Sequence, residues 1–220
     1  MSEAGIHTGN SSTRRPVTIV AVGGPSCSGK STLVQALESH WTPVNAVVLP
    51  IDAYYRGLAH LPVEERMQCN FDSPESIEWA LLKRDLAALT AGEAIERPVY
   101  DYTAHARTKE TIRLKSRPLV IVEGLFALWP DFLRRQAAAR VYVDLPMEQC
   151  LARRIARDSA ERGRSEAQVR EQFERFVRPM AEQHVLPTRA SADLVLPGDG
   201  SLKHAVERVA NLLDQTLAAT

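Results

Sequence analysis

A glycine-rich stretch near the amino terminus has the residue types and spacing needed to hold a phosphate group. Residues 20–34 read VAVGGPSCSGKSTLV, in which four positions separate Gly24 from Gly29, and Lys30 and Ser31 follow directly. Glycines let backbone N–H groups converge on phosphate oxygens, and a following helix adds its positive amino-terminal end. Lys30 would reach the β- and γ-phosphates of a nucleoside triphosphate, and the Ser31 hydroxyl would bind Mg²⁺. The pattern therefore predicts a P-loop.

The context favours a P-loop over a glycine turn that only begins a helix. An apolar, β-branched run precedes the glycines and a helical pattern follows them. The glycine spacing also differs from the G-x-G-x-x-G spacing of dinucleotide-binding sites. We expect the donor, ATP or GTP, to be bound by Gly24, Pro25, Ser26, Cys27, Ser28, Gly29, Lys30, Ser31 and Thr32.

Two carboxylates stand at the ends of expected strands, where open α/β sheets place their ligands. Glu123 follows LVIV, the position expected for an acid that helps to hold Mg²⁺ beside a P-loop. Asp52 follows VVLPI and could accept the proton of an attacking hydroxyl or bind the water shell of the metal. Either acid alone is also typical of a simple turn. The two together, beside a P-loop, favour a phosphoryl-transfer site.

Spacing alone does not decide whether two other residues, Asp72 and His105, have a functional role. Asp72, in CNFDSPES, suits a turn before Pro74 as well as it suits a binding role. His105 is a single histidine in a polar segment, and such a residue is usually solvated.

Arginines are dense in residues 153–178, at Arg153, Arg154, Arg157, Arg162 and Arg164. Interleaved acids such as Asp158 also suit a solvated, ion-paired helix. Because a P-loop is present, we favour a lid that supplies cations to the triphosphate and excludes water, with Gly163 as a hinge.

Composition limits the class of protein. The chain has 220 residues, and its 27 Lys and Arg balance 27 Asp and Glu, so no overall field indicates nucleic acid or an anionic membrane as a partner. No apolar run approaches the roughly 20 residues that span a bilayer. Three widely spaced cysteines fit a reducing, cytoplasmic setting. Residues 1–15 are polar and are expected to form a flexible tail rather than a signal peptide.

Strand and helix patterns alternate along the rest of the chain. Strands are expected at 17–22, 44–50, 118–125, 139–146 and 192–197. Helices are expected at 30–41, 74–92 and 202–217, and a long arginine-rich helical region at about 147–185. This alternation predicts a parallel sheet covered on both faces by helices, an α/β fold of three layers. Residues 96–116 break it with two period-2 stretches, which indicate an inserted β-hairpin. We expect a single kinase domain over 16–220, with a helical lid at about 153–178.

These pieces together resemble the uridine kinase (uridine-cytidine kinase) family of P-loop nucleoside kinases. The motifs that carry the resemblance include GGPSCSGKST, DAYY, NFDSP, RPVYDYTAHAR, IVEGL, RRIARDSAERGR and PTRASADLVLP, in family order over residues 17–197. The P-loop alone is shared with many kinases, whereas YDYTAHAR and RRIARD are far more selective. The sequence departs from the family in places. Residues 100–102 read YDY, where the family frequently has Tyr-Asp-Phe, and residues 196–209, LPGDGSLKHAVERV, lack the usual Pro-Arg-Gly-Gly pattern.

The resemblance implies a role for each matching residue. Asp52 would be the catalytic base for the nucleoside 5′-hydroxyl, with Ser31 and Glu123 around Mg²⁺. Arg157 and Arg162 would contact the triphosphate. The residues expected to bind the nucleoside are Tyr55, Phe71, Asp72, Tyr100, His105, Arg154, Arg164 and Gln172. The implied reaction is phosphorylation of uridine, and of cytidine, in pyrimidine salvage, by a cytoplasmic homotetramer.

Two other functions stay open on the residues themselves. One is another small-alcohol kinase of the same scaffold, similar to phosphoribulokinase or pantothenate kinase. A sugar-phosphate acceptor would call for extra cations in place of the tyrosines and histidine of residues 96–116. The other is a non-catalytic P-loop switch, which would not need an acid such as Asp52.

Overall fold

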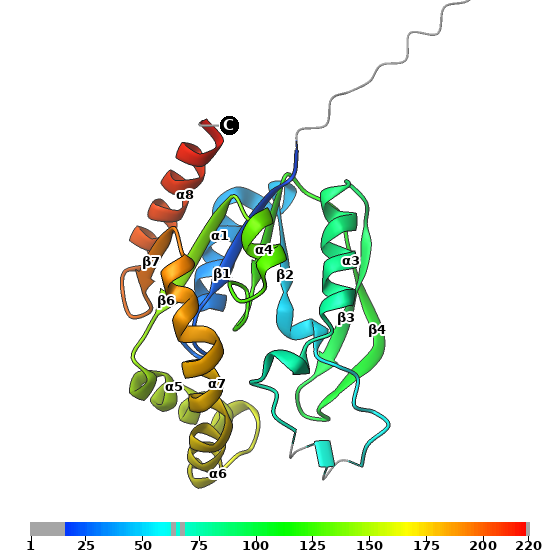
Figure 1. Cartoon of the computed structure of the whole chain (residues 1–220), viewed down its shortest axis with the longest axis vertical. Coiled ribbons are helices and arrows are strands. Elements are labelled where there is room, and N and C mark those ends of the chain that lie inside the picture. Colours follow the sequence, from blue (N-terminus) through cyan, green and yellow to red (C-terminus); the bar gives the residue numbers. More distant parts are fainter. Residues whose placement is uncertain (1–15, 63–64, 67–68, 219–220) are drawn as a thin grey trace, which may run out of the picture.

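A central parallel sheet organises the molecule. The computed structural model describes residues 16–62, 65–66 and 69–218, and the expected tail at 1–15 lies outside them. Within this described part the sheet has five strands in the order β2-β5-β1-β6-β7 (Figure 1). Their bounds are β1 Thr18–Gly23, β2 Ala46–Pro50, β5 Leu119–Glu123, β6 Ala139–Asp144 and β7 Leu194–Pro197.

Both faces of the sheet are buried under other elements. Along β1, Val20 and Val22 belong to a core that includes residues of α1 (Lys30–Asn45) and α8 (Leu202–Ala218). The alternate residues Ile19 and Ala21 belong to a second core, which includes residues of α3 (Trp79–Thr90) and α4 (Asp131–Gln136). Side chains of a strand alternate between faces, so one apolar strand serves both cores. The predicted three-layer α/β fold is confirmed.

The expected hairpin forms a small antiparallel sheet of its own. It consists of β3 (Ile95–Asp101) and β4 (Ala106–Leu114), with an irregular register between Pro98 and Tyr100. β3 packs on α3 and on the short 3₁₀ helix Ile51–Tyr54 that follows β2. This packing brings the hairpin to the carboxyl end of β2, where Asp52 lies.

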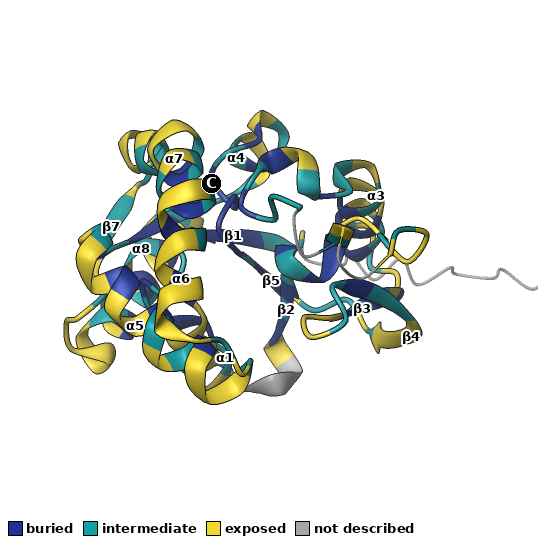
Figure 2. Ribbon diagram, turned by 90° about the horizontal axis from the view of Figure 1, so that it is seen from below, coloured by how far each residue is buried: buried dark blue, intermediate teal, exposed yellow. Residues whose placement is uncertain are grey.

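The arginine-rich region expected at about 147–185 is helical and consists of a series of shorter pieces. It comprises α5 (Met147–Glu161), α6 (Glu166–Gln172), the π-helical turns Phe173–Val177 and Ala181–Val185 with α7 (Arg178–Met180) between them, and the 3₁₀ helix Leu186–Ser191. Gly163 separates α5 from α6 with a φ of +64°, a left-handed conformation that favours glycine. Ser165 then begins α6 with a capping box to Gln168. Figure 2 shows α5 and α6 side by side.

Some element bounds differ from the expectation for physical reasons. The helix expected from Pro74 begins at Trp79, because Pro74–Ser76 forms a 3₁₀ turn and the extended Ile77 pairs with Tyr55. α1 continues to Asn45, so β2 begins at Ala46. The six-residue α4 was not expected, since so short a helix shows little periodicity.

Candidate active site

The P-loop connects β1 to α1 at the carboxyl edge of the sheet. Gly24 has a φ of +139°, and a Cβ there would lie 2.3 Å from the Val143 carbonyl oxygen, so the position requires glycine. Gly29 has a φ of +109° and precedes the first residue of α1. Lys30 is buried, and its Nζ donates a hydrogen bond to the Pro25 carbonyl oxygen at 2.7 Å. The loop thus places a buried cation at the amino-terminal end of a helix, where an anion is also attracted by the helix dipole.

Two carboxylates face this cation from neighbouring strands. Glu123 ends β5 and pairs with Pro50 at the end of β2, two residues before Asp52. Burial raises the pKa of Asp52, and burial together with the Asp52 charge raises the pKa of Glu123 to about 7. Burial lowers the pKa of Lys30, while Glu123 and Asp52 oppose that change. The three groups therefore form one electrostatic unit.

Most of the predicted site residues lie around one cavity. Its lining comprises Ser26, Cys27, Lys30, Ser31, Asp52, Tyr55, Phe71, Asp72, Tyr100, Tyr102, His105, Glu123, Gly124, Leu125, Arg154, Arg157, Arg162, Arg164 and Gln172. The P-loop and the carboxylates form one end, which we call the donor end. Lining residues of the hairpin, of segment 55–72, of α5 and of α6 form the other end, which we call the acceptor end.

Aromatic rings line the acceptor end. The centroids of Tyr55 and Phe71 are 5.6 Å apart, and those of Tyr55 and Tyr100 are 5.1 Å apart. Phe71 stacks on the imidazole of His105 at 5.0 Å with an interplanar angle of 22°. Such a cluster offers flat apolar surface to a planar ligand.

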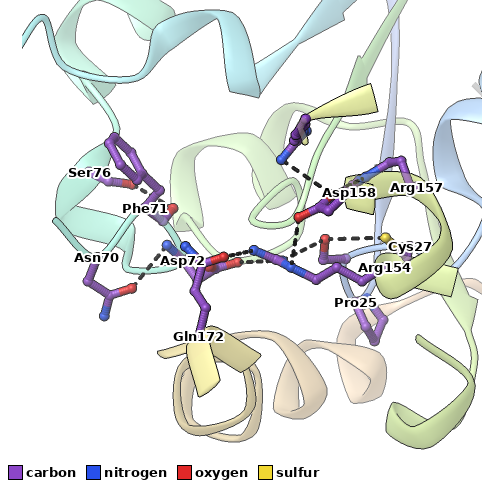
Figure 3. Close-up of polar contacts among 12 residues, drawn as sticks. Pro25, Cys27, Asn70, Phe71, Asp72, Ser76, Arg154, Arg157, Asp158 and Gln172 are labelled. Carbon is purple, nitrogen blue, oxygen red and sulfur yellow. Dashed lines mark hydrogen bonds and ion pairs between the residues drawn. The ribbon is translucent and has the colours of Figure 1, made fainter. Parts of the chain in front are cut away.

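A buried ion pair lies beside the rings (Figure 3). Arg154 Nη1 is 3.6 Å from Asp72 Oδ1, and both residues are buried. The backbone N–H of Asp72 donates to Asn70 Oδ1 at 3.1 Å, and Arg154 Nη2 donates to Gln172 Oε1 at 3.2 Å. An ionised carboxylate only accepts hydrogen bonds, so Asp72 can accept from ligand hydroxyl groups.

His105 and α6 meet at the acceptor end. Arg164 Nη1 donates to Gln172 Oε1 at 2.8 Å, and Arg164 Nη2 lies 3.3 Å from His105 Nε2. Burial, followed by the charge of Arg164, lowers the pKa of His105 below its ordinary value of 6.5. A neutral ring accepts at Nε2 and keeps an N–H at Nδ1.

Three residues that line the cavity, Tyr102, Gly124 and Leu125, were absent from the predicted site, and so was Asp158, which lies outside the lining. Tyr102 lines the cavity, and the Arg162 guanidinium lies 5.3 Å from the centroid of its ring. Asp158 is fully buried behind the lid arginines, whereas its place among charged residues suited an exposed helix face. The spacing of Arg154, Asp158 and Arg162 at intervals of four residues was the sequence signal for Asp158.

A second cavity adjoins the donor end and shares Cys27, Lys30, Ser31 and Arg157 with the first. Its other lining residues include Gly29, Thr32, Gln35, Pro197 and Gly198. Of the predicted donor-binding residues, Gly24, Pro25 and Ser28 line neither of these cavities within the described chain.

Magnesium suits the side chains at the donor end. Ser31, Asp52 and Glu123 offer a hydroxyl and two carboxylates, the hard oxygen ligands that Mg²⁺ prefers. Among the residues that the structure describes, no group of three or more His, Cys, Asp or Glu is arranged to hold a metal ion. Mg²⁺ usually keeps several waters and binds one or two carboxylates plus substrate phosphates, so these three side chains fit it as ligands.

The fold and the site define a P-loop kinase. Two solved structures share the fold. The first is D-glycerate 3-kinase from Cryptococcus neoformans, at a TM-score of 0.63 with 16% identity, covering 88% of this chain and 90% of that one. The second is phosphoribulokinase from Rhodobacter spheroides, at a TM-score of 0.63 with 20% identity, covering 83% and 70%. At such low identity these likenesses establish the fold alone.

Sequence similarity identifies the family. The model of the Phosphoribulokinase / Uridine kinase family matches residues 19–203. The chain is 42% identical over 199 residues to the uridine kinase of Proteus mirabilis, covering 89% of this chain and 93% of that protein. It is 38% identical over 202 residues to the uridine kinase of Chloroflexus aurantiacus, covering 92% and 97%. The chain belongs to the phosphoribulokinase/uridine kinase family, as its motifs indicated.

Proposed function

We propose that this chain is a uridine kinase, which transfers the γ-phosphoryl group of ATP or GTP to the 5′-hydroxyl of uridine and also of cytidine. The observation that carries the proposal is the cavity itself, in which a P-loop faces an acceptor end built from aromatic rings and a buried Asp72–Arg154 pair. The identity to uridine kinases over most of the chain supports the same substrate.

The donor end binds the triphosphate and neutralises its charge. Lys30 and the backbone of the P-loop would hold the phosphates, while Arg157 and Arg162 approach from the lid. Mg²⁺, held by Ser31, Glu123 and Asp52, would offset negative charge on the phosphate oxygens. Phosphoryl transfer has a loose transition state, so positioning and charge neutralisation supply most of the catalysis.

The acceptor end positions the nucleoside. Asp72 would accept hydrogen bonds from the ribose hydroxyls and Arg154 would donate to their oxygens. The rings of Tyr55, Phe71 and Tyr100 would pack against the base. His105, with Arg164 and Gln172, would hydrogen-bond the edge of the pyrimidine. Asp52 lies on the same cavity as the P-loop and would accept the proton of the 5′-hydroxyl.

The family supports three further parts of the proposal. We infer one kinase domain over residues 16–220, a homotetrameric assembly and a cytoplasmic site of action in pyrimidine salvage. Within the described residues, no helix has both the length and the apolar character that crossing a membrane requires. Light scattering coupled to size exclusion would measure the mass of the assembly.

A panel of acceptors tests the substrate. Each of uridine, cytidine, adenosine, 2′-deoxyuridine, ribulose 5-phosphate and pantothenate is incubated with ATP and Mg²⁺, and products are identified by mass spectrometry. We expect monophosphates from uridine and cytidine, little product from 2′-deoxyuridine, and none from the bulkier adenosine. Phosphorylation of ribulose 5-phosphate or pantothenate in place of the nucleosides would refute the assignment while leaving the kinase class intact.

A further inference from the structure

Asp158 is a fully buried carboxylate that no substrate is expected to touch, and it lies on α5 behind the cavity (Figure 3). Within the part of the chain that the structure describes, its carboxylate contacts four guanidinium groups. All four belong to arginines that line the cavity: Arg154, Arg157, Arg162 and Arg164. A buried carboxylate is stable only when it is well paired, and here one acid orders the cationic wall of the site.

The two carboxylate oxygens of Asp158 contact different pairs of arginines, and each pair is assigned to a different substrate. Oδ1 accepts a hydrogen bond from Nε of Arg157 at 2.8 Å and forms an ion pair with Nη2 of the same residue, also at 2.8 Å. It lies 3.7 Å from Nη1 of Arg162. These two arginines are assigned to the triphosphate in the proposed function.

Oδ2 faces the other pair. It lies 3.7 Å from Nε of Arg154 and 3.3 Å from Nη1 of Arg164. Arg154 also contacts Asp72, and Arg164 also contacts His105 and Gln172, so both reach the acceptor end. One carboxyl group therefore touches the cations of both ends.

We propose that Asp158 is a positioning residue that couples the two substrate sites, so that binding of the triphosphate strengthens binding of the nucleoside. In the absence of substrate, four cations share a single carboxylate. A triphosphate that engages Arg157 and Arg162 takes over part of their pairing, which leaves Asp158 to hold Arg154 and Arg164 more firmly. Because binding free energies are linked, the nucleoside must strengthen triphosphate binding by the same factor. This inference rests on the proposed function.

Isothermal titration tests the coupling. The affinity for uridine is measured with and without a saturating, non-hydrolysable ATP analogue and Mg²⁺, in the wild type, in Asp158→Asn and in Glu166→Gln. Glu166 is a matched control, because it is an exposed lid acid that pairs with Arg170 at 2.7 Å. We expect the analogue to tighten uridine binding by about 5- to 50-fold in the wild type and in Glu166→Gln, and by less than about 2-fold in Asp158→Asn.

The ratio of the two affinities separates coupling from a purely structural role. If Asp158 only stabilised the fold, its loss would lower the melting temperature while the ratio stayed at the wild-type value, and that result would overturn the inference. A wild type that binds uridine with no coupling would also overturn it and leave the proposed function standing. A folded wild type that does not bind uridine would instead refute the proposed function.

A second variant covers the case in which Asp158→Asn does not fold. Asp158→Glu keeps the buried charge but moves the carboxylate by one methylene group, so its oxygens cannot face both pairs of arginines as they do in the wild type. We expect its coupling ratio to fall at least threefold below the wild-type ratio. Wild-type coupling in this variant would contradict the division of the two oxygens described above.

Discussion

The donor end and the acceptor end of the cavity are built in different ways. Apart from Asp52 and Glu123, the donor end is built on nine consecutive residues, Gly24 to Thr32, and uses backbone conformation and one buried lysine. The acceptor end takes side chains from segment 55–72, from the hairpin, from α5 and from α6. The first is a local structure that many kinases can share, whereas the second exists only when distant segments pack together. Substrate choice should therefore depend on the acceptor end, and the chemical step on the donor end.

Replacement of the buried lysine should give the largest effect and should be confined to the donor end. We expect Lys30→Ala to lower kcat by about 10³-fold, because it removes a preorganised cation from the phosphates. Uridine affinity, measured by titration calorimetry, should change less than threefold. Lys109→Ala, on the exposed face of β4, is the control and should turn over normally. Near-normal turnover of Lys30→Ala would remove the P-loop from the mechanism.

Replacement of the acceptor-end carboxylate should change the kinetics of one substrate only. We expect Asp72→Ala to raise the KM for uridine by about 10- to 100-fold, the effect of leaving buried polar partners unpaired. The KM for ATP should stay within twofold. The wild type should discriminate against 2′-deoxyuridine, and the variant should discriminate less. Equal increases in the KM for uridine and the KM for ATP would mean that Asp72 has a structural role. The donor and acceptor ends would then not be separate binding sites for the two substrates.

A smaller effect should appear as a pH dependence at the acceptor end. The pKa of His105 lies below its ordinary value of 6.5 because burial and Arg164 disfavour the charged ring. The stability that the neutral ring contributes is thus present above pH 6.5 and is lost as the pH falls through the lower pKa of the folded state. The protonated ring would also repel Arg164, so the KM for uridine should rise severalfold as the pH falls from 7.5 through the lowered pKa of His105.

His105→Gln supplies the comparison for that measurement. Its KM for uridine should be higher at neutral pH and should change little over the same range, since glutamine does not titrate. The melting temperature of the wild type should also fall more steeply on acidification than that of the variant. Parallel pH profiles in the two proteins would place the titrating group elsewhere.

The sequence was most informative where function is local. The P-loop could be predicted because its glycines, Lys30 and Ser31 are adjacent in the chain. Asp52 and Glu123 could be predicted because Glu123 ends a buried strand and Asp52 closely follows another, and the structure places β2 and β5 side by side. The hairpin was visible as two period-2 stretches, although its packing against the turn at Ile51–Tyr54 was not.

The remaining features of the site depend on packing between segments that are far apart in the sequence. Asp158 and Glu161 both lie among arginines near the end of α5, yet Asp158 is fully buried and Glu161 is exposed. The difference arises because α6 and the π-helical turn after it pack on α5 through Val169 and Phe173, a contact that no local sequence pattern predicts. Asp72 and His105 were equally undecided by spacing, and only the family resemblance favoured them before the structure placed both on the cavity.

One measurement tests the central claim most directly: the rate of formation of uridine monophosphate from uridine and ATP with Mg²⁺, in the wild type and in Asp52→Asn. We expect the wild type to form one monophosphate for each ADP released. The variant should bind uridine within about threefold of the wild type and form product at least about 100-fold more slowly, as loss of a general base implies. A wild type that makes no uridine monophosphate, or a variant that matches its rate, would contradict the account.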